Sequence, residues 1–439
     1  MTRQKQKFDL CIIGGAGHVG LPLGVAFANR GVRTSLFDVN KEWLSLIRAG
    51  KFPFREEKGT QELRRALKRG TLLVSETPDV ISKSANVLLV IGTPVDEYLN
   101  PDFTNLLRTI DSYFTFFRDG QTLILRSTVY PGTSERIQRY FHERGKKVGI
   151  AFCPERIVQG KSLIELGKLS QIVSAFDAKT ARRVGALFDK LATKIIFTQK
   201  PIEAELAKLF SNAWRYIRFA VANQFFMIAE EHHLDYHRIY EAMRKDYPRN
   251  KDIPGPGFSA GPCLLKDTMQ LAAFNNNNFF IGHAAMLVNE GLPNYLMQQL
   301  KHGQIGAVEK LVGQLSGNLT AQKSLQSVRR SLQEAGDLKK KTIGILGMAF
   351  KAESDDSRDS LSYKLRKLAQ AEAKRVLCTD VYIKDSSFVS IDTVLAESDI
   401  LIVAAPHKQY ASISPNKLRG KVIVDIWNHL PRSARTLWL

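Results

Sequence analysis

Cysteine and histidine are sparse in this chain, and neither is spaced for a metal site. The four cysteines, Cys11, Cys153, Cys263 and Cys378, are widely scattered through the 439 residues, with no CxxC pair. This pattern is typical of a reducing compartment and argues against a structural zinc site. The nine histidines form no HExxH motif, so we also expect no catalytic metal.

Long hydrophobic runs are also missing. No apolar stretch approaches the roughly 18 residues that a membrane-spanning helix requires. The N-terminus, MTRQKQKFDLCIIGGAGHVG, places basic residues before an apolar run and superficially resembles a signal peptide. That run is only about five residues long, and no small-residue cleavage site follows it. We therefore interpret it as the first strand of a domain and expect a cytoplasmic protein with no membrane partner.

Acidic residues are in the minority. The chain has 63 lysines and arginines against 43 aspartates and glutamates, a formal net charge of +20. Such a charge could serve nucleic acid, whose phosphates it would neutralise, or anionic nucleotides, which a basic field attracts. The basic residues are spread along the chain apart from modest runs such as Lys339–Lys341. No recognised nucleic-acid module is present, so we expect no specific nucleic acid as a partner.

The order of apolar patterns predicts the domains. The chain is long enough for two or three. Residues 1–199 alternate short β-branched runs with helical patterns, which predicts a parallel sheet with crossover helices. The candidate strands are Leu10–Gly14, Thr34–Asp38, Val87–Ile91, Thr122–Arg126, Gly149–Phe152 and Ile172–Ser174.

A long helical pattern follows from about Ile202 to His232, and helical content continues to about residue 300. This helix would be roughly 45 Å long, the size of a central scaffold or dimer element. Residues 301–340 are polar and basic and look like a linker or helical insertion. A second α/β pattern covers 341–439, with strands expected at Lys341–Leu346, Leu401–Ala405 and Val422–Asp425. The predicted fold class is α/β: two doubly wound parallel-sheet domains joined by an all-helical centre, 200–300, with a long helix.

A dinucleotide fingerprint opens the first domain. A GxGxxG motif directly follows an apolar strand and precedes a helical pattern; its residues are Gly15, Gly17, His18, Val19 and Gly20. Glycines there let the backbone turn tightly and approach a pyrophosphate at the helix N-terminus. Asp38 closes the next strand, where a carboxylate would bind a ribose 2′-hydroxyl and repel a 2′-phosphate. We therefore predict NAD as the cofactor; the alternative is a glycine turn that serves only packing.

Two later turns fit the same site. Gly92–Thr93–Pro94 and the segment STVYPGT, residues 127–133, each follow a buried strand. The carboxyl ends of strands are where ligands bind in open parallel sheets. We single out Thr93 and Thr128, although ordinary turns would give nearly the same pattern.

The Gly/Pro-rich stretch PGPGFSAGPCLLKD, residues 254–267, carries the cysteine that we expect to be reactive. Cys263 precedes an amphipathic helical pattern, so its thiol would feel the positive end of the helix dipole, and Lys266 lies one turn further on. Both favour the nucleophilic thiolate. The alternative is a buried, inert cysteine, which is the role we expect for Cys11 and Cys378.

Other polar residues interrupt apolar patterns. Lys208 and Asn212 are four residues apart, hence on one face of the long helix; a solvated stripe is the alternative. Glu155, in FCPERI, follows a strand end and could reach the same cleft. With Cys263, these residues suggest a dehydrogenase with a covalent step. A thiol can hold an aldehyde after one hydride transfer and allow a second oxidation.

These motifs resemble the UDP-glucose/GDP-mannose dehydrogenase family over nearly the whole chain. The segments that carry the resemblance are GGAGHVGLP, IGTPVDEYLNPD, STVYPGT, FCPERI, ELAKLFSNAWR, FSAGPCLLKD, NEGLP and ILGMAFKAESDDSRDS. The resemblance implies an NAD-binding Rossmann domain, a helical dimerisation domain and a Rossmann-like domain for the nucleotide diphosphate. It also implies a homodimer formed through the central helix.

The resemblance further implies a four-electron oxidation of a UDP-sugar at C6. The C6 hydroxyl becomes an aldehyde that Cys263 holds as a thiohemiacetal; a second oxidation gives a thioester, and water releases the uronic acid. Lys208 and Asn212 would stabilise oxyanions at C6. Asp267 and Glu155 would position or activate water.

The resemblance also assigns binding residues. The implied cofactor contacts beyond the fingerprint are Thr93, Thr128, Lys266 and Arg358. The implied substrate contacts are Glu155, Arg156, Lys208, Asn212, Arg249, Phe258, Gly261, Phe350 and Lys351. Arg249 fits an arginine that can enter the neighbouring subunit's site. The runs RIVQG after Glu155 and YPR around Arg249 resemble the branch that acts on UDP-N-acetylhexosamines, such as UDP-N-acetylmannosamine or UDP-N-acetylglucosamine.

Several alternatives stay open. UDP-glucose or GDP-mannose could be the substrate, and Leu265, in place of a frequent proline or aromatic residue, could alter substrate fit. A two-electron dehydrogenase of the 3-hydroxyacid or 6-phosphogluconate type shares the first two domains but needs neither Cys263 nor a third domain. A catalytically silent protein that binds nucleotide sugars or nucleic acid would leave Cys263, Lys208, Asn212 and Asp267 unexplained.

Overall fold

The computed structural model describes residues 7–93, 103–258, 261, 263–302, 337–431 and 437–438. The chain forms two compact units: Met1–Asn212 with Lys266–Asn278, and Ala213–Leu265 with Phe279–Leu439. The linker or helical insertion that we predict at 301–340 lies outside the described residues from 303 to 336.

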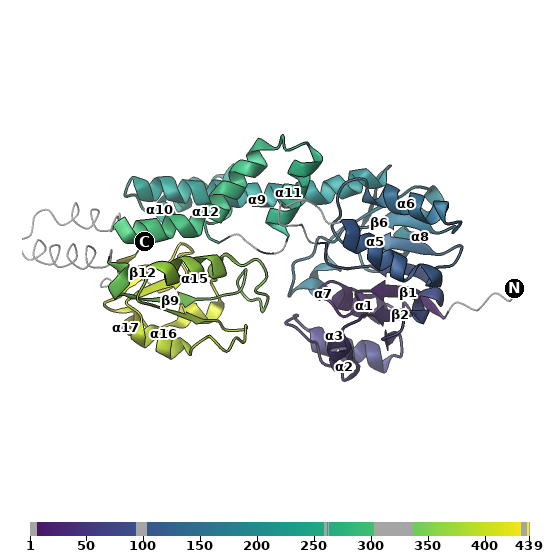
Figure 1. Cartoon of the computed structure of the whole chain (residues 1–439), viewed down its shortest axis with the longest axis horizontal. Helices are drawn as coiled ribbons and strands as arrows, with labels where there is room; N and C mark the ends of the chain where they lie inside the picture. The colour runs from purple at the N-terminus through teal and green to yellow at the C-terminus, as the bar shows by residue number, and fades with distance from the viewer. Residues whose placement is uncertain are drawn as a thin grey trace, which may run out of the picture. The chain divides into compact units, whose positions relative to one another are not determined.

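The first unit is built on one sheet, drawn in purple to blue in Figure 1. This sheet has eight strands in the order β3-β2-β1-β4-β5-β6-β7-β8. Its strands are β1 (Phe8–Ile13), β2 (Thr34–Phe37), β3 (Leu72–Ser75), β4 (Ser84–Leu89), β5 (Thr122–Leu125), β6 (Gly149–Phe152), β7 (Gln171–Ala175) and β8 (Ile195–Phe197). The strand order changes direction between β1 and β4, and open parallel sheets bind ligands at such a switch point.

Helices cover both faces of this sheet, which explains the apolar character of its central strands. In β1, Leu10 and Ile12 join one buried cluster, whereas Cys11 and Ile13 join another. Successive residues of a strand point to opposite faces, so a strand covered on both sides is apolar throughout. The helices are α1 (Gly20–Asn29), α2 (Lys41–Arg48), α3 (Gly59–Lys68), α4 (Asp79–Ser82), α5 (Phe103–Ser112), α6 (Thr133–Glu143), α7 (Ser162–Glu165) and α8 (Ala178–Phe188).

The strand prediction holds with one difference in direction. All six predicted strands are present, and β3 and β8 were not predicted. The strand predicted at Ile172–Ser174 is β7, which pairs antiparallel with β6 through Ala151 and Ala175 instead of in parallel. The connection between them holds only the four-residue helix α7, so the chain does not cross the sheet. It turns back at the carboxyl end of β6, and the loop after β6 stays at that edge.

The second unit contains a parallel sheet in the order β10-β9-β11-β12-β13. Its strands are β9 (Thr342–Leu346), β10 (Arg375–Thr379), β11 (Ile400–Val403), β12 (Val422–Val424) and β13 (Leu437–Trp438), with helices α15 (Leu361–Glu372), α16 (Ile391–Glu397) and α17 (Pro415–Leu418). The three predicted strands are β9, β11 and β12. The prediction of two doubly wound α/β domains around a helical centre is therefore confirmed.

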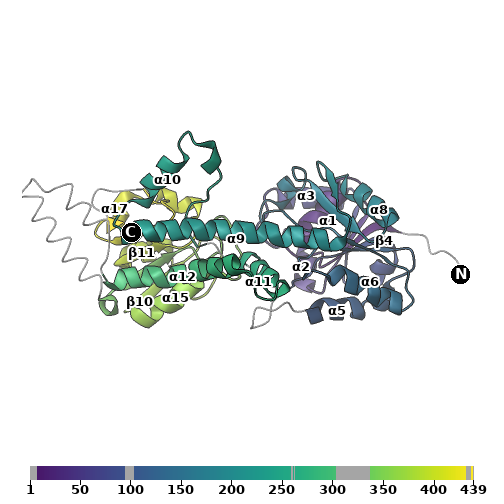
Figure 2. The ribbon, with the colours of Figure 1, turned by 90° about the horizontal axis from the view of Figure 1, so that it is seen from above.

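The central helices include the long one that the sequence predicts. Helix α9 (Pro201–Glu231) has 31 residues, and Figure 2 shows it as one uninterrupted helix. It is followed by α10 (Tyr236–Arg244), α11 (Leu264–Phe274) and α12 (Phe280–His302), and α12 packs against α15. Among the helices in the described ranges, none is long and apolar enough to cross a membrane.

Candidate active site

The glycine fingerprint lies where the carboxyl end of β1 leads into α1. Gly14 has a φ of +80°, and a Cβ atom there would lie 1.8 Å from the Val90 carbonyl oxygen. A Cβ atom at Gly20 would lie 2.2 Å from the Gly14 carbonyl oxygen, whereas one at Gly17 would meet only that oxygen, at 3.5 Å. Packing thus requires glycine at Gly14 and at Gly20 but not at Gly17. An open glycine in such a turn fits the close approach of a dinucleotide pyrophosphate.

The Asp38 carboxylate ties this turn to the end of β2. Its Oδ2 accepts a hydrogen bond from Ala16 N at 2.9 Å, and its Oδ1 accepts one from Asn40 N at 3.0 Å. A carboxylate can accept about four hydrogen bonds, so Asp38 keeps acceptor capacity for a ribose hydroxyl. The His18 ring stacks on Phe54 with centroids 4.1 Å apart, which steadies the turn further. These residues fit NAD as the sequence predicts.

The turns after β4 and β5 are hydrogen-bonded to each other at the same edge. Ser127 Oγ accepts from Ile91 N at 2.9 Å and donates to Ile91 O at 2.6 Å. Thr93 Oγ1 donates to Thr128 O at 2.6 Å. The structure therefore brings Thr93 and Thr128, which we predicted from separate motifs, side by side at the carboxyl ends of neighbouring strands.

Buried Glu205 on α9 holds the far end of the β5 turn. It accepts hydrogen bonds from Gly132 N at 2.7 Å, Ser134 N at 2.9 Å and Ser134 Oγ at 2.6 Å. Burial raises the pKa of Glu205, against the lowering effect of these donors. Our sequence reasoning missed this residue, whose one signal was a carboxylate within the apolar pattern EAELAKLF.

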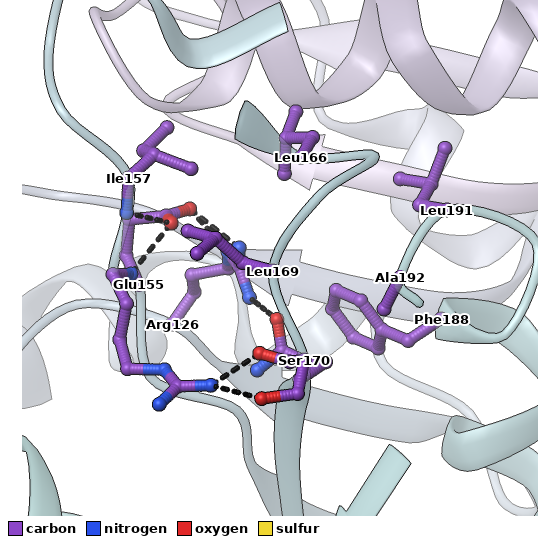
Figure 3. Close-up of a pocket in the computed structure, with 11 residues that line it drawn as sticks. Arg126, Glu155, Ile157, Leu166, Leu169, Ser170, Phe188, Leu191 and Ala192 are labelled. Carbon is purple, nitrogen blue, oxygen red and sulfur yellow. Dashed lines mark hydrogen bonds and ion pairs between the residues drawn. The ribbon is translucent and has the colours of Figure 1, made fainter. Parts of the chain in front are cut away.

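Glu155, on the loop after β6, is held by an arginine that sequence reasoning also missed (Figure 3). Arg126 Nε donates to Glu155 Oε2 at 2.8 Å, and Arg126 Nη2 lies 2.5 Å from the same oxygen. The other carboxylate oxygen accepts from Arg156 N at 2.7 Å and Ile157 N at 2.9 Å. The available signal was a charged residue at the end of the apolar strand TLILR.

The cavity beside this ion pair is small. It is lined by Arg126, Glu155 and Arg156 together with apolar side chains such as Leu166 and Phe188 (Figure 3). The space in it that the centre of a water molecule can occupy is about 20 Å³. The cavity therefore has room for roughly one water molecule. A nucleotide does not fit in this cavity, so the cavity is not itself a nucleotide-binding site.

Three residues predicted from two separate motifs, Asn212, Lys266 and Asp267, form a polar cluster in the first unit. Asn212 Nδ2 donates to Asp267 Oδ2 at 2.6 Å, and Lys266 Nζ lies 2.6 Å from Asp267 Oδ1. Asp267 is fully buried, and these two hydrogen-bonding partners offset the cost of burying its polar side chain. Lys208 lies one turn before Asn212 on α9. Lys266, predicted as a cofactor contact, is thus engaged with the neighbouring carboxylate.

Cys263 is exposed and directly precedes α11, whereas Cys11, Cys153 and Cys378 are buried. Burial raises the pKa of Cys11 and of Cys153 to about 12 and that of Cys378 to about 11. These three thiols are therefore poor nucleophiles near neutral pH. The described residues contain no group of three or more His, Cys, Asp or Glu side chains placed to hold a metal ion.

The loop before Cys263 is anchored within the second unit. Gly257 N donates to Asn223 Oδ1 at 2.7 Å, and a Cβ atom at Gly257 would lie 2.3 Å from the Trp427 ring. Gly261 has a φ of +110°, and a Cβ atom there would lie 2.5 Å from the Phe350 ring. Gly261 N also donates to Asp359 O at 3.2 Å. Two predicted substrate residues, Gly261 and Phe350, are therefore in contact.

The second unit also contains the predicted residues Arg249, Phe258, Lys351 and Arg358. Arg358 binds Asp356 through Nε at 3.0 Å and Nη2 at 2.6 Å. This hydrogen bonding raises the pKa of Arg358, with a smaller electrostatic contribution from Cys263. Lys351 Nζ lies 5.6 Å from the Phe350 ring centroid, and Phe258 is buried. Arg249 lies on η2 (Pro248–Asn250), its guanidinium 5.9 Å from the Tyr247 ring centroid.

A turn like the cofactor turn occurs after β9. Gly347 has a φ of +91°, and a Cβ atom there would lie 2.5 Å from the Ala405 carbonyl oxygen. Asp380, after β10, accepts from Met348 N at 2.6 Å and Ala349 N at 3.0 Å, and lies 3.2 Å from His407 Nε2. Burial alone would raise the pKa of Asp380, but the hydrogen bonds from His407 and the backbone lower it to about 2.

The fingerprint turn at the switch point of the first sheet, with an acidic residue closing β2, is that of a nicotinamide-dependent dehydrogenase. Models of the UDP-glucose/GDP-mannose dehydrogenase family match the chain in three parts. They cover 8–192 as the NAD binding domain, 202–290 as the central domain and 344–432 as the UDP binding domain. The chain belongs to this family and is an NAD-dependent UDP-sugar dehydrogenase, which confirms the predicted cofactor and enzyme class.

Individual relatives match almost end to end. The UDP-N-acetyl-D-mannosamine dehydrogenase of Methanocaldococcus jannaschii is 26% identical, over 98% of this chain and 93% of the relative. A solved UDP-D-ManNAc dehydrogenase from Pyrococcus horikoshii superposes with a TM-score of 0.84 at 24% identity, with 98% of each chain covered. A UDP-glucose dehydrogenase from Pyrobaculum islandicum gives 0.83 at 24% identity, over 100% of this chain and 98% of its own. Both structures support the fold.

Proposed function

We propose that this chain oxidises C6 of a UDP-N-acetylhexosamine, such as UDP-N-acetylmannosamine or UDP-N-acetylglucosamine, to the uronic acid through covalent intermediates on Cys263. The observation that carries the proposal is the exposure of Cys263 at the start of α11, whose first turn holds Lys266 and Asp267. The named function of the M. jannaschii relative and the runs RIVQG and YPR support this substrate class.

The proposed chemistry assigns one task to each residue. Bound NAD supplies the hydride acceptor for each of the two oxidations. The Cys263 thiolate adds to the C6 aldehyde as a thiohemiacetal, which becomes a thioester when C6 loses a hydride. Water then forms a bond to C6 as the carbon–sulfur bond breaks, returning the thiolate and releasing the carboxylic acid. Lys208 and Asn212 supply donors for negative charge on the C6 oxygen, and Asp267 is placed to position or activate water.

Counting NADH against a panel of sugars tests this function. We expect two NADH per sugar, because each oxidation removes one hydride from C6. We also expect kcat/KM for UDP-N-acetylmannosamine or UDP-N-acetylglucosamine to exceed that for UDP-glucose by roughly tenfold or more, since a site built for the N-acetyl group leaves polar groups unpaired without it. A count of one would contradict the covalent double oxidation. Preference for UDP-glucose or GDP-mannose would favour the alternative substrates.

We propose functional domains at 1–199, 200–300 and 341–439, with 301–340 as the connection. The family matches at 8–192, 202–290 and 344–432 lie inside these ranges and support them. The four scattered cysteines support a cytoplasmic location, because such a pattern suits a reducing compartment.

We also propose a homodimer formed through α9. This helix exposes an apolar stripe at helical spacing, which consists of Trp214, Val221, Phe225 and Ile228, exposed by 58%, 43%, 40% and 45%. Residues at these intervals share one helix face. A contiguous exposed apolar face is typical of a protein interaction surface, and a second copy of the same helix supplies a matching face.

Trp214→Glu combined with Phe225→Glu is expected to weaken such a dimer by about 100-fold or more, because it places unpaired carboxylates in a desolvated interface. Sedimentation equilibrium at micromolar concentration would show a shift from dimer to monomer. Leu73→Glu is the matched control, since Leu73 is 40% exposed on β3 and lies outside the stripe. A wild-type monomer, or an unchanged dimer in the double variant, would refute this interface.

A further inference from the structure

We propose that Glu205 is a positioning residue for hydride transfer. Its carboxylate belongs to α9 but caps the N-terminus of α6, and it thereby fixes Lys208 and Asn212 relative to the turn that carries Thr128. The inference rests on the proposed function, in which Lys208 and Asn212 serve C6 of the sugar. Thr128 is the predicted cofactor contact, so Glu205 would hold the two sides of the reaction at a fixed distance.

Helix α6 has no cap of its own. Its N-cap residue is Gly132, which has a φ of +91° and no side chain that could accept a hydrogen bond. The first N–H groups of a helix have no partner inside that helix. Glu205 Oε2 accepts from Gly132 N at 2.7 Å, and Oε1 accepts from Ser134 N at 2.9 Å. A carboxylate is favoured at the positive end of a helix dipole, so Glu205 supplies the missing cap from another helix.

The contact is fully buried. Ser134 Oγ donates a third hydrogen bond to Glu205 Oε1 at 2.6 Å, and the two side chains are 1% and 0% exposed. The three donors are neutral, and their hydrogen bonds offset the cost of burying a carboxylate. A buried polar network that is satisfied specifies one arrangement, because any other leaves its groups unpaired. Glu205 therefore fixes α9 and α6 in one relative position.

The face of α9 that carries Glu205 also carries two proposed catalytic residues. Glu205, Lys208 and Asn212 are three and four residues apart, so they lie on one face of the helix. Asn212 Nδ2 donates to Asp267 Oδ2 at 2.6 Å, which joins this face to the first turn of α11. All of these residues belong to the first unit. A shift of α9 at Glu205 would therefore also move Lys208 and Asn212.

The other end of the contact leads to the cofactor side. Thr133 N and Oγ1 donate to Tyr130 O at 3.1 and 2.5 Å, which closes the segment 130–133 on itself. Two residues before Tyr130, the Thr128 carbonyl oxygen accepts from Thr93 Oγ1 at 2.6 Å. The turn after β5 is thus held at one end by Glu205 and at the other by the turn after β4. Its position relative to α9 depends on the Glu205 carboxylate.

Glu205→Gln tests the inference, because glutamine has the same shape but only one acceptor oxygen. In either orientation its NH2 group faces Gly132 N or Ser134 N, so one buried backbone donor loses its acceptor. We expect the rate constant of the first hydride transfer to fall by roughly 100-fold, as small displacements of reacting groups can cause. The dissociation constants for NAD and for the UDP-sugar should stay within about threefold of wild type.

Single-turnover stopped flow separates a positioning role from a loss of folded enzyme. Enzyme and NAD are held in saturating excess over the UDP-sugar that the wild type oxidises fastest, and NADH formation is followed. Under these conditions a smaller folded fraction leaves the rate constant unchanged, whereas displaced reacting groups lower it. An unchanged rate constant in Glu205→Gln would overturn the inference.

Asp177→Ala is the matched control. Asp177 is the N-cap of α8, which has 11 residues like α6, and it accepts from Thr180 N at 2.8 Å and Thr180 Oγ1 at 2.7 Å. Loss of this cap should lower the melting temperature by about 2–4 °C and leave the rate constant unchanged. An equal loss of rate in Asp177→Ala would assign the effect to general destabilisation and overturn the role of Glu205.

Ser134→Ala decides the question if Glu205→Gln does not fold. It removes one of the three hydrogen bonds and keeps both backbone donors, so we expect a rate constant about threefold lower with unchanged dissociation constants. A full rate constant would then refute the inference. The wild-type NADH count reports on the proposed function independently. A count of one contradicts the covalent second oxidation and leaves the first hydride transfer, on which the role of Glu205 is measured.

Discussion

Cys263→Ala is expected to abolish uronic acid formation, with kcat for the complete oxidation lower by about 10⁴-fold or more, as for loss of a catalytic nucleophile in other enzymes. Alanine offers no sulfur for the thiohemiacetal, so the aldehyde cannot be held for the second oxidation. The cofactor turn belongs to the other unit, so the dissociation constant for NAD should change by less than about twofold.

Mass spectrometry of the product and titration with NAD measure the two effects. Cys378→Ala is a suitable control because Cys378 is buried in β10; it should lower the free energy of unfolding and leave the mechanism intact. Iodoacetamide, which alkylates accessible thiols, should modify Cys263 first and so inhibit uronic acid formation. This is expected because Cys263 is exposed and the other three cysteines are buried. Uronic acid formation by Cys263→Ala within tenfold of the wild-type rate would exclude the covalent mechanism.

Gly14→Ala is expected to abolish NAD binding and to lower the free energy of unfolding by about 3 kcal/mol or more. Part of this cost is the left-handed backbone, roughly 1–2 kcal/mol for a residue with a Cβ atom. The rest arises because that Cβ atom would lie 1.8 Å from the Val90 carbonyl oxygen. A backbone atom cannot rotate away, so the turn or the end of β4 must shift.

Substitutions at two further glycines separate the backbone cost at Gly14 from its steric clash and from the loss of NAD binding. Gly120 has a φ of +83° with nothing within 4 Å of its Cβ position, so Gly120→Ala should show the backbone cost alone. At Gly17 a Cβ atom would meet only the Gly14 carbonyl oxygen, at 3.5 Å. Gly17→Ala should therefore keep its stability and weaken NAD binding, by about tenfold or more, because the methyl group obstructs the pyrophosphate. Denaturant titration and cofactor titration would show this contrast; equal stability losses at Gly14 and Gly120 would contradict it.

Local patterns predicted most of the fold but not every strand or its direction. Strands such as β1, covered on both faces, leave a continuous apolar run, and α9 leaves a long helical repeat. The unpredicted β8 has three residues, two of them exposed, so neither run nor alternation marks it. The reversal of β7 depends on where the connecting chain travels, which the residues Gln171–Ala175 do not encode by themselves.

In the candidate site, too, residues in local motifs could be predicted from the sequence, whereas contacts between distant residues could not. Cys263, Lys208, Asn212 and Asp267 stand in motifs, so their roles could be proposed from the sequence. The partners of Glu155 could not, because Arg126 is 29 residues away along the chain and nothing local couples the two. Contacts of this kind are fixed by the sheet, which brings the ends of β5 and β6 together.

The two glycine turns differ in what their carboxylates leave available. Asp38 accepts hydrogen bonds from Ala16 N and Asn40 N and can still accept two more. Asp380 is saturated by backbone donors and His407. A ribose hydroxyl therefore finds an acceptor at the first turn and none at the second. Asp38 can therefore select a ribose hydroxyl at the first turn, whereas a nucleotide at the second turn would have to be bound through groups other than Asp380.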